Sequence, residues 1–564
     1  MIERSAYAAQ YGPTTGHQVR LADTDLRITV GADHVGYGDE PLFGFGKTLR
    51  SRVFQADLAP RDSELDFAVI GVVLIDPLAG VLKTNLGIKD GRVVGIGPIN
   101  GPAAHGQDLV VGPNTYPIPA YGLIATPGGV DSHVHLPTPR LVPSALSAGV
   151  TTLITAGFEE PPYGMHRMLM AFEDLPVNIG LQACARTSRP ETSEAVITAG
   201  AIGLKVHEDF GAYPELIDAA LRSADAHDIA VCLHTDGLNE SAEIDDTLAA
   251  IAGRTTHAYH VEGSAGGHLP DNMLLVTDPA VICSSTTPSI PYASYTAAEH
   301  VDMILAVHGG NPDLAHDVLA VRERVHEFTM AAEGPLHDFG AISITNSDSQ
   351  GVGRMGETIR RTWQLADAMK RWRAGAGADW ANDGYPLANP PDDNPRILQY
   401  LAKYTIEPAI VHGISHEVGS LMPGRLADIV LWRPGLFGVK PELVLKNGFE
   451  AWGPLGDGNG SIERVQPVTY GAHWGATGAA GAALGTTFVS QACLDAGIGG
   501  LPRTRRRLSP VHGTRGLTRA NLVANRSSPP IQIDPTTGQV WLSGRTLASP
   551  PVEHVPMNRT YLLS

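Results

Sequence analysis

Two histidines stand two residues apart in the string GGVDSHVH, at the end of an apolar run. On a β-strand, side chains at positions i and i+2 point to the same side, so His133 and His135 can both reach one metal ion. An HxH pair is equally compatible with two polar residues that hydrogen-bond to neighbouring loops. The pair predicts a metal site only if further ligands lie nearby.

Further residues of ligand type follow later apolar runs. They are Lys205 in GLKVHEDF, His234 in VCLHTDGLNE, His260 in AYHVEG and Asp348 in TNSDSQ. A lysine that closes an apolar strand is unusual, because an unpaired buried ammonium is costly. Lys205 becomes a ligand if its amine is carboxylated, since the two oxygens of the carbamate can bridge two cations. The alternative is an ion pair with Glu208 or Asp209.

These residues need a scaffold that brings strand ends together. From about Leu123 to Tyr404, strand-like apolar runs alternate with amphipathic helix-like stretches such as PELIDAALRSADAHD. Such alternation predicts parallel βαβ units. Their number favours an α/β fold with a TIM-type (β/α)8 barrel over residues 123–410, in which reactive residues lie at the C-terminal ends of the strands.

The chain on either side of the predicted barrel is rich in strand signals. DFAVIGVVLID and TNLGIKDGRVVGIG alternate apolar and polar residues, and Asp90-Gly91 is typical of a hairpin turn. GRLADIVLW and PELVLKNGFEAW form a second such region. We expect one discontinuous β-rich domain, residues 1–122 and 411–465, and a C-terminal appendage of helices and loops, residues 466–564.

Composition excludes several classes of function. The formal net charge of −18 argues against nucleic-acid binding. The basic cluster of Arg503, Arg505, Arg506 and Arg507 is short, and we expect it on a solvated or subunit-contacting surface. No signal peptide and no apolar run long enough to cross a membrane is evident, and the four cysteines are widely spaced. These features favour a cytoplasmic protein.

The set HxH, Lys, His, His and Asp resembles the amidohydrolase superfamily, and longer strings resemble the catalytic (alpha) subunit of urease. The resemblance runs nearly end to end, through YGPTTGHQVRLADTDL, AGAIGLKVHEDF, HTDGLNES, NSDSQGVGRMGE and YTIEPAIVHGISHEVGSL. It implies that His133, His135 and Asp348 bind one metal ion and that His234 and His260 bind the other. It also implies that N6-carboxylated Lys205 bridges two divalent metal ions, which in ureases are nickel, although the ligand types suit other metals as well.

The resemblance also implies roles in catalysis. One cation polarises the substrate carbonyl, and water bound between the cations loses a proton and attacks. His207 resembles the histidine that donates a hydrogen bond to the substrate oxygen. His308 resembles the flap histidine that protonates the leaving amine. Asp209 and Arg324 resemble the residues that orient that histidine. Each of these residues, taken alone, is also compatible with an ordinary structural or surface role.

Three departures from the urease pattern concern the pocket. Val307 replaces the flap cysteine, and Gly309 stands where ureases usually carry another histidine. The loop after the second barrel strand, TAGFEEPPYGMHRML, is shorter than in ureases, which brings Glu159, Glu160 and Tyr163 to a strand end. One hypothesis is that Glu159 or Glu160 contacts an amine-bearing part of a larger substrate. The alternative is that both carboxylates are solvated.

The leading hypothesis is hydrolysis of urea or a related linear C–N substrate, with release of ammonia. The alternatives are hydrolysis of a substituted urea or guanidino compound, and a non-catalytic urease paralogue; the presence of both His207 and His308 argues against the paralogue. The resemblance implies partners of the urease beta and gamma type, metallochaperones, and a homotrimer or a trimer of heteromers.

Overall fold

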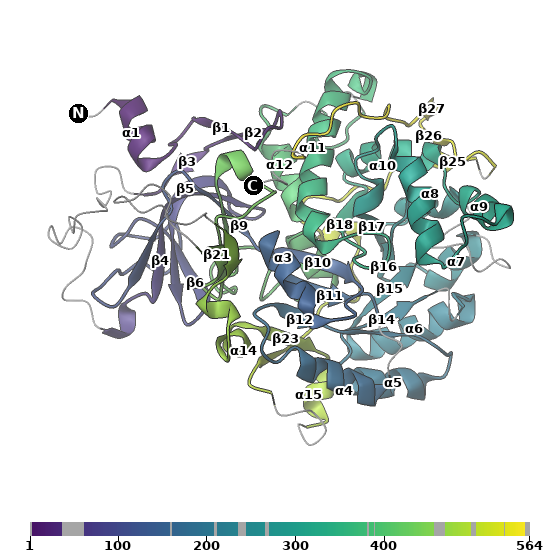
Figure 1. Ribbon diagram of the computed structural model, residues 1–564, viewed down its shortest axis with the longest axis horizontal. Coiled ribbons are helices and arrows are strands. Elements are labelled where there is room, and N and C mark those ends of the chain that lie inside the picture. Colours follow the sequence, from purple (N-terminus) through teal and green to yellow (C-terminus); the bar gives the residue numbers. More distant parts are fainter. Residues whose placement is uncertain are drawn as a thin grey trace.

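The computed structural model describes residues 3–35, 61–157, 161–207, 211–234, 244–264, 270–380, 383–388, 390–455, 469–497, 504–534 and 536–558. Figure 1 shows a β-rich unit, mainly purple, beside a larger unit of blue and teal strands and helices. None of the helices in these ranges is both long enough and apolar enough to cross a membrane.

The larger unit is a barrel of parallel strands. In chain order these are β10 (Gly129–Val134), β11 (Val150–Thr155), β12 (Asn178–Gly180), β13 (Gln182–Cys184), β14 (Gly203–Val206), β15 (Ala230–His234), β16 (Thr256–Tyr259), β17 (Val281–Thr286) and β18 (Ile342–Asn346). β12 pairs with β11 and β13 pairs with β14, so these two short strands occupy one position of the barrel. A parallel bridge between Val134 and Ser349 brings the end of β18 beside β10 and closes the ring. The predicted barrel fold is confirmed.

Helices follow most of the strands and cover the barrel. They are α3 (Val142–Ser147), α4 (Pro162–Ala171), α5 (Pro190–Thr198), α6 (Pro214–His227), α7 (Ile244–Ile251), α8 (Thr296–Val307), α9 (Ala315–Arg322), α10 (Glu327–Asp338), α11 (Thr358–Ala374), α12 (Asn394–Ala402) and α13 (Ile406–Val411). The sequence explains the bounds of α6, for example. Pro214 occupies its first turn, and Asp228, with φ of +50°, ends it in the left-handed conformation.

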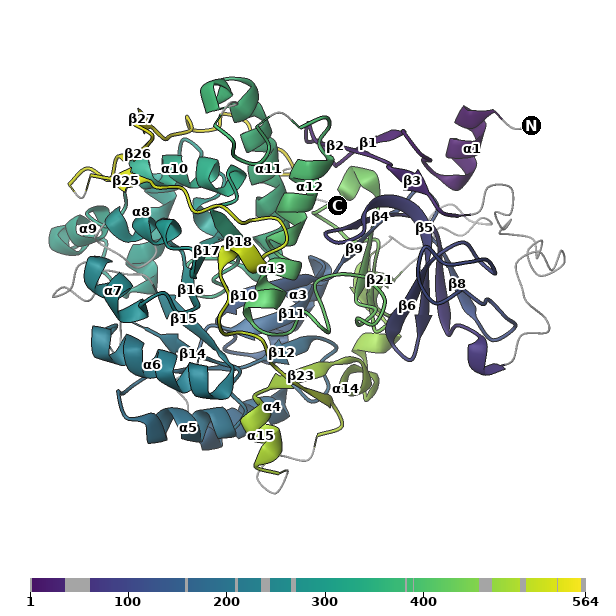
Figure 2. The ribbon, with the colours of Figure 1, turned by 180° about the vertical axis from the view of Figure 1, so that it is seen from behind.

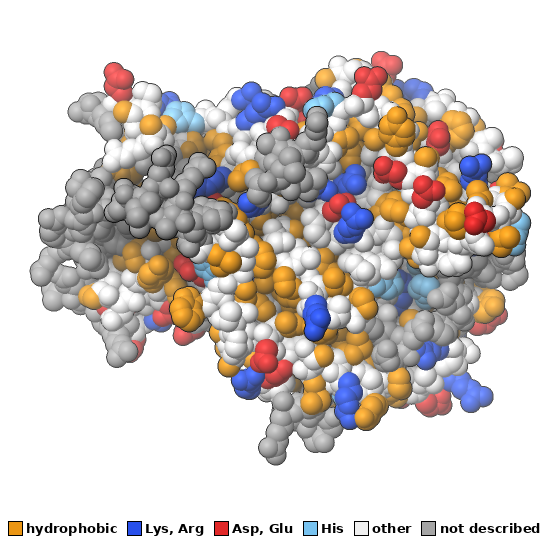
Figure 3. Space-filling view, in the orientation of Figure 1, with side chains coloured by type: hydrophobic (Ala, Val, Ile, Leu, Met, Phe, Trp, Pro, Cys, Tyr) orange, Lys and Arg blue, Asp and Glu red, His pale blue; other side chains and the backbone are white. Residues whose placement is uncertain are grey.

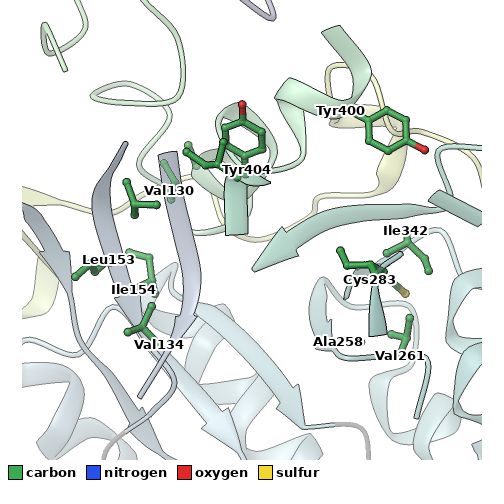
Figure 4. Close-up of a cluster of buried hydrophobic side chains, with 14 of the residues drawn as sticks. Val130, Val134, Leu153, Ile154, Ala258, Val261, Cys283, Ile342, Tyr400 and Tyr404 are labelled. Atoms are coloured by element: carbon green, nitrogen blue, oxygen red, sulfur yellow. The ribbon is translucent and has the colours of Figure 1, made fainter. Parts of the chain in front are cut away.

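A continuous apolar core joins the strands to these helices. Side chains of β10 and β11, such as Val130 and Leu153, belong to the same cluster as Ile342 of β18 and Tyr400 of α12 (Figure 4). Burying a side chain such as Val or Leu stabilises the fold by about 1.5–3 kcal/mol relative to leaving it exposed. The barrel is therefore a rigid support for polar residues at its strand ends.

The β-rich unit is a single sheet built from two separate parts of the chain. Its strands are β3 (Ala32–Asp33), β4 (Phe67–Asp76), β5 (Gly80–Lys89), β6 (Arg92–Gly97), β7 (His105–Gly106), β8 (Tyr116–Pro119), β9 (Ile124–Pro127), β19 (Ile429–Trp432), β20 (Leu443–Lys446), β21 (Phe449–Pro454) and β22 (Tyr470–Ala472). β9 pairs with both β4 and β19, which joins the two parts. Lys89 pairs with Arg92 across Asp90-Gly91, both with positive φ, as the hairpin prediction requires. A short N-terminal segment adds α1 (Arg4–Tyr11), β1 (Gln18–Arg20) and β2 (Arg27–Thr29).

The C-terminal region differs from the expected appendage of helices and loops. It contains α14 (Ala480–Leu484), β23 (Thr486–Val489), α15 (Gln491–Asp495), β24 (Arg507–Pro510), β25 (Gln532–Ile533), β26 (Val540–Leu542) and β27 (Arg545–Thr546). β23 pairs in parallel with β12 and β24 extends the same sheet. Figure 2 shows this segment continuing across the barrel unit to β25–β27. Its Gly- and Ala-rich composition gave little sign of these strands.

The basic cluster is also placed differently from the expectation. Arg506 is buried, and it donates to the carbonyls of Phe172, Leu175 and Val177. The prediction of a solvated surface is therefore wrong for this residue. Arg503 lies outside the described residues.

Candidate metal centre

The six predicted ligands sit at the C-terminal ends of barrel strands. His133 and His135 belong to β10 and the residue after it, Lys205 to β14, and His234 ends β15. His260 directly follows β16, and Asp348 follows β18 by two residues. Figure 3 shows histidine side chains on the surface to the right of the centre of this face. Parallel strands thus bring residues from distant parts of the sequence to one mouth.

His133, His135 and Asp348 form the first group. Nε2 of His133 and Nε2 of His135 each lie 3.3 Å from Oδ1 of Asp348, and the three donor atoms lie within 4.8 Å of one another. A separation of 3.3 Å is long for a hydrogen bond but ordinary for two ligands of one cation. Oδ1 of Asp348 is buried without a hydrogen bond to any described residue. This group therefore fits a divalent metal ion.

The protonation states of this group also suit a metal. Burial lowers the pKa of His133 well below its ordinary value, so its imidazole is neutral and offers a lone pair. Burial opposes ionisation of Asp348, but the neighbouring imidazoles of His133 and His135 hold its pKa well below the usual range. Neutral imidazole and carboxylate are the forms that bind metal.

Lys205, His234 and His260 lie next to the first group. Nε2 of His260 is 3.0 Å from Nδ1 of His234, and Nζ of Lys205 is 3.4 Å from Nε2 of His133. The rings of His133 and His260 are 5.7 Å apart. Lys205 is fully buried, and its amine lies beside His133 of β10. The six side chains therefore lie close together at one end of the barrel.

The backbone around two of these ligands is unusual. Asp348 has a φ of +51° and His260 a φ of +30°, conformations that non-glycine residues rarely adopt. Such strain is found mainly at functional sites, where the surrounding structure holds it. A Cβ on Gly351 would lie 2.4 Å from Oδ1 of Asp348, and one on Gly353 would lie 1.9 Å from the Ser347 carbonyl. Both glycines are needed for the loop that carries Asp348.

Asp131 fixes this loop against β10. Its Oδ1 accepts hydrogen bonds from the amides of Ser347, at 3.0 Å, and His133, at 3.4 Å. Its Oδ2 accepts from the Thr358 hydroxyl at 3.1 Å. Burial raises the pKa of Asp131 to about 6. One buried carboxyl group thus orders segments that carry ligands from opposite ends of the barrel sequence.

The predicted catalytic residues are placed less completely. His207 follows β14, and its ring lies 4.5 Å from that of His234, beside the second group. His308 is exposed at the end of α8, where its Nδ1 donates to the Ile304 carbonyl at 2.9 Å. Arg324 is half-buried between α9 and α10, and Asp209 lies outside the described residues. The helices α8 and α9 belong to the connection that leaves the C-terminal end of β17, on the side of the barrel where the ligands lie.

Of the predicted pocket residues, two lie outside the described part of the chain and two are exposed on the surface. Glu159 and Glu160 lie outside the described residues. Tyr163 is exposed at the start of α4, where its hydroxyl accepts from Arg167 and the guanidinium lies 3.9 Å from the ring centroid. Val307 is also exposed, and Gly309 has a φ of +66°, so a side chain there would be strained.

Sequence reasoning missed Tyr259, which supports both groups from below. Its ring stacks on His133 with centroids 3.9 Å apart, and Nζ of Lys205 lies 4.3 Å from its centroid. Its hydroxyl donates to the Ser132 carbonyl and accepts from Gln182. The alternation in THAYH, with His257 and Tyr259 two residues apart on β16, could have indicated two inward-facing side chains.

Comparison with known proteins identifies the family of the chain. The family model "Urease alpha-subunit, N-terminal domain" matches residues 1–118, and the model "Amidohydrolase family" matches residues 124–451. Urease subunit alpha 1 of Streptomyces avermitilis is 45% identical over 567 residues, which cover 99% of each chain. The chain belongs to the urease alpha-subunit family. Urease subunit alpha 2 of Streptomyces coelicolor is also 45% identical, over all of both chains, and urease subunit alpha of Haloquadratum walsbyi is 43% identical.

Membership of this family has direct consequences for function. The chain is a urease-like amidohydrolase, a hydrolase of C–N bonds in linear amides, as the sequence resemblance implied. The family and its fold imply a dinuclear metal centre, and the two groups of ligands described above fit one.

Proposed function

We propose that this chain hydrolyses urea at a pair of nickel ions. His133, His135 and Asp348 would hold one ion, His234 and His260 would hold the other, and Lys205, carboxylated at Nζ, would supply oxygen ligands to both. The observation that carries the proposal is the convergence of two imidazole nitrogens on one carboxylate oxygen, each at 3.3 Å. Such a pair of cations polarises a carbonyl group and lowers the pKa of bound water.

Lys205 supports this assignment through its surroundings. A fully buried ammonium 3.4 Å from an imidazole nitrogen would add positive charge to a place that already has to accept two cations. Carboxylation replaces that charge with an anion and supplies two oxygen ligands. The carbamate therefore removes an electrostatic conflict that unmodified lysine would create.

His207 and His308 act on the substrate in this proposal. His207 lies beside the second ligand group, where an N–H can donate to the urea oxygen as negative charge develops on it. His308 donates a proton to the departing nitrogen, which needs one because an amide anion is a very poor leaving group. Asp209 and Arg324 orient His308.

The proposal extends to assembly and location. The names of the relatives, urease subunit alpha, describe each as one subunit of a larger enzyme. We propose that this chain likewise assembles with beta- and gamma-type subunits as a trimer of such units, and that metallochaperones load its nickel. Tyr295 and Trp474 are about three-quarters exposed, which is unusual for aromatic side chains and suits a subunit contact. The four cysteines are free thiols, which fits the cytoplasm.

The test combines metal analysis with ammonia release. Purified protein, with its companion subunits, is expected to contain two nickel ions per chain and to release ammonia from urea faster than from substituted ureas or guanidines. Two metal ions per chain with release only from a substituted compound would replace urea by that substrate. Protein that binds no metal at the candidate ligands would refute the proposal.

A further inference from the structure

A second cluster of metal-binding side chains lies inside the barrel, away from its mouth. It consists of Cys232 on β15, His257 on β16 and His412, which directly follows α13. Sγ of Cys232 is 3.9 Å from Nδ1 of His257, and Nδ1 of His257 is 3.3 Å from Nε2 of His412. All three ligand atoms lie within 4.8 Å of one another.

This cluster is distinct from the dinuclear centre. Cys232 and His257 are paired neighbours on adjacent strands, two and three residues before His234 and His260. Tyr259 separates the two places, because its ring stacks on His133 on one side and meets His257 edge-on, at 4.5 Å, on the other. None of the three residues is a predicted ligand of the dinuclear centre, and all three are at most 1% exposed.

The triangle of donor atoms has the size of a metal site. A point equidistant from the three atoms lies about 2.1–2.4 Å from each, given the two separations and the limit on the third, whereas Zn–S and Zn–N bonds are about 2.3 and 2.0–2.1 Å. A hydrogen bond between the two imidazoles would explain one contact only. It would give the Cys232 thiol, 3.9 Å from the same Nδ1 of His257, no role.

We propose that Cys232, His257 and His412 bind a third metal ion, a thiophilic d10 cation such as Zn²⁺ or Cu⁺. The donor set of one sulfur and two imidazoles selects such ions over Mg²⁺ or Ca²⁺, which need oxygen ligands. On binding, the Cys232 thiol loses its proton to solvent and the sulfur forms a bond to the cation, with no change of oxidation state.

The histidines are already in the form that binds metal. Burial lowers the pKa of His412 to about 3 and that of His257 well below its ordinary value, so both rings are neutral near pH 7. No proton has to leave either ring for a lone pair to reach the ion. The electrostatic cost of a cation here is reduced by the thiolate that forms with it.

The ion would join parts of the chain that are distant in sequence. β15 and β16 belong to the barrel wall, whereas His412 arrives from the segment after α13, which contacts β10 and β18. A bond from one ion to all three would fasten that segment to the opposite side of the barrel interior. Because all three ligands are buried, we expect the ion to have a structural role.

The experiment uses intact protein produced with nickel and with zinc or copper, and it measures metal per chain and X-ray absorption at the zinc and copper edges. We expect one zinc or copper ion beyond the dinuclear pair, with a metal–sulfur distance of about 2.3 Å for zinc. Absence of any metal–sulfur scattering would overturn the proposal without the use of a variant. The edge that carries the sulfur signal distinguishes Zn²⁺ from Cu⁺.

Variants separate this site from the dinuclear centre. Cys232→Ala should lose one metal ion per chain and the thiolate-to-cobalt charge-transfer band of cobalt-substituted protein. Cys493→Ala, a buried cysteine of α15 outside the cluster, should keep both. Asp348→Ala should deplete the dinuclear centre and leave the band intact, so failure of the proposed urea chemistry and failure of this site give different results. If Cys232→Ala does not fold, His412→Gln serves as the second variant. An unchanged band in either variant would refute the assignment.

Discussion

Replacing His308 with alanine tests the proposed proton donor most directly. Because a carbonyl oxygen can only accept a hydrogen bond, the contact of 2.9 Å between Nδ1 and the Ile304 carbonyl requires the proton to be on Nδ1. Nε2 then carries a transferable proton only when the ring is doubly protonated. His308 directly follows α8, where the helix dipole stabilises a nearby cation by about 0.3–1 kcal/mol.

The expected loss of activity follows from the role of His308 as a general acid. Loss of a general acid typically slows a reaction by about 10²–10⁴-fold, which corresponds to about 2.7–5.4 kcal/mol of activation free energy. Above the pKa of the imidazole, the doubly protonated fraction falls about tenfold for each pH unit. The ratio of wild-type to His308→Ala activity is therefore largest at low pH and decreases as the pH rises.

The assay is the pH profile of kcat for ammonia release, with metal content measured in each sample. His316→Ala is the matched control, because His316 lies on α9 in the same connection and its side chain is 87% exposed. The control should keep the wild-type profile. A His308→Ala enzyme with wild-type kcat, or with a lower kcat in constant ratio to wild type at every pH, would refute the role of proton donor.

Three other outcomes follow from the structure. Asp348→Ala should lose at least one metal ion per chain and all measurable urea hydrolysis while keeping the wild-type circular dichroism; retention of two ions would contradict the ligand assignment. Removal of metal by a chelator should lower Tm, because ions that bind only the folded state stabilise it. Addition of nickel together with bicarbonate should restore Tm, whereas nickel alone should not. Equal recovery of Tm without bicarbonate would contradict the bridging carbamate. Arg519→Met should lower the free energy of unfolding by about 2–5 kcal/mol in denaturant titrations, because the buried guanidinium donates to the carbonyls of Val276, Val281 and Ser527. Arg505 is exposed, so the control variant Arg505→Met should lower it by less than about 1 kcal/mol.

The sequence predicts the barrel well, because its strands are buried on both faces and appear as short apolar runs. VTTLITAG and AIGLKVHE contain the strands β11 and β14. It does not predict that β23 and β24 continue the sheet beyond β12. β23 pairs with β12, a strand more than 300 residues away in the chain, and β24 pairs with β23. The small residues around them carry little periodic signal.

Charged residues show the same limit. The sequence places Arg506 in a basic cluster, which usually indicates a solvated surface. In the structure its guanidinium is surrounded by backbone carbonyls that end α4 and precede β12. Five N–H donors allow one arginine to satisfy several carbonyls at once, and only the tertiary arrangement shows that such carbonyls are present.

The alternation of side chains along a strand explains why the ligands at the mouth are easier to predict than the cluster below them. His133 and His135 are recognisable in the sequence because they form an HxH pair. His260 and Asp348 are recognisable because each follows an apolar strand. One step down the same strands, Cys232 and His257 also face the interior, but each is a single polar residue within an apolar run. His412 is supplied by a segment that no pattern connects to β16. The alternation of side chains along a strand therefore predicts which residues face the barrel interior. It does not predict that Cys232, His257 and His412 come together, because that depends on tertiary packing.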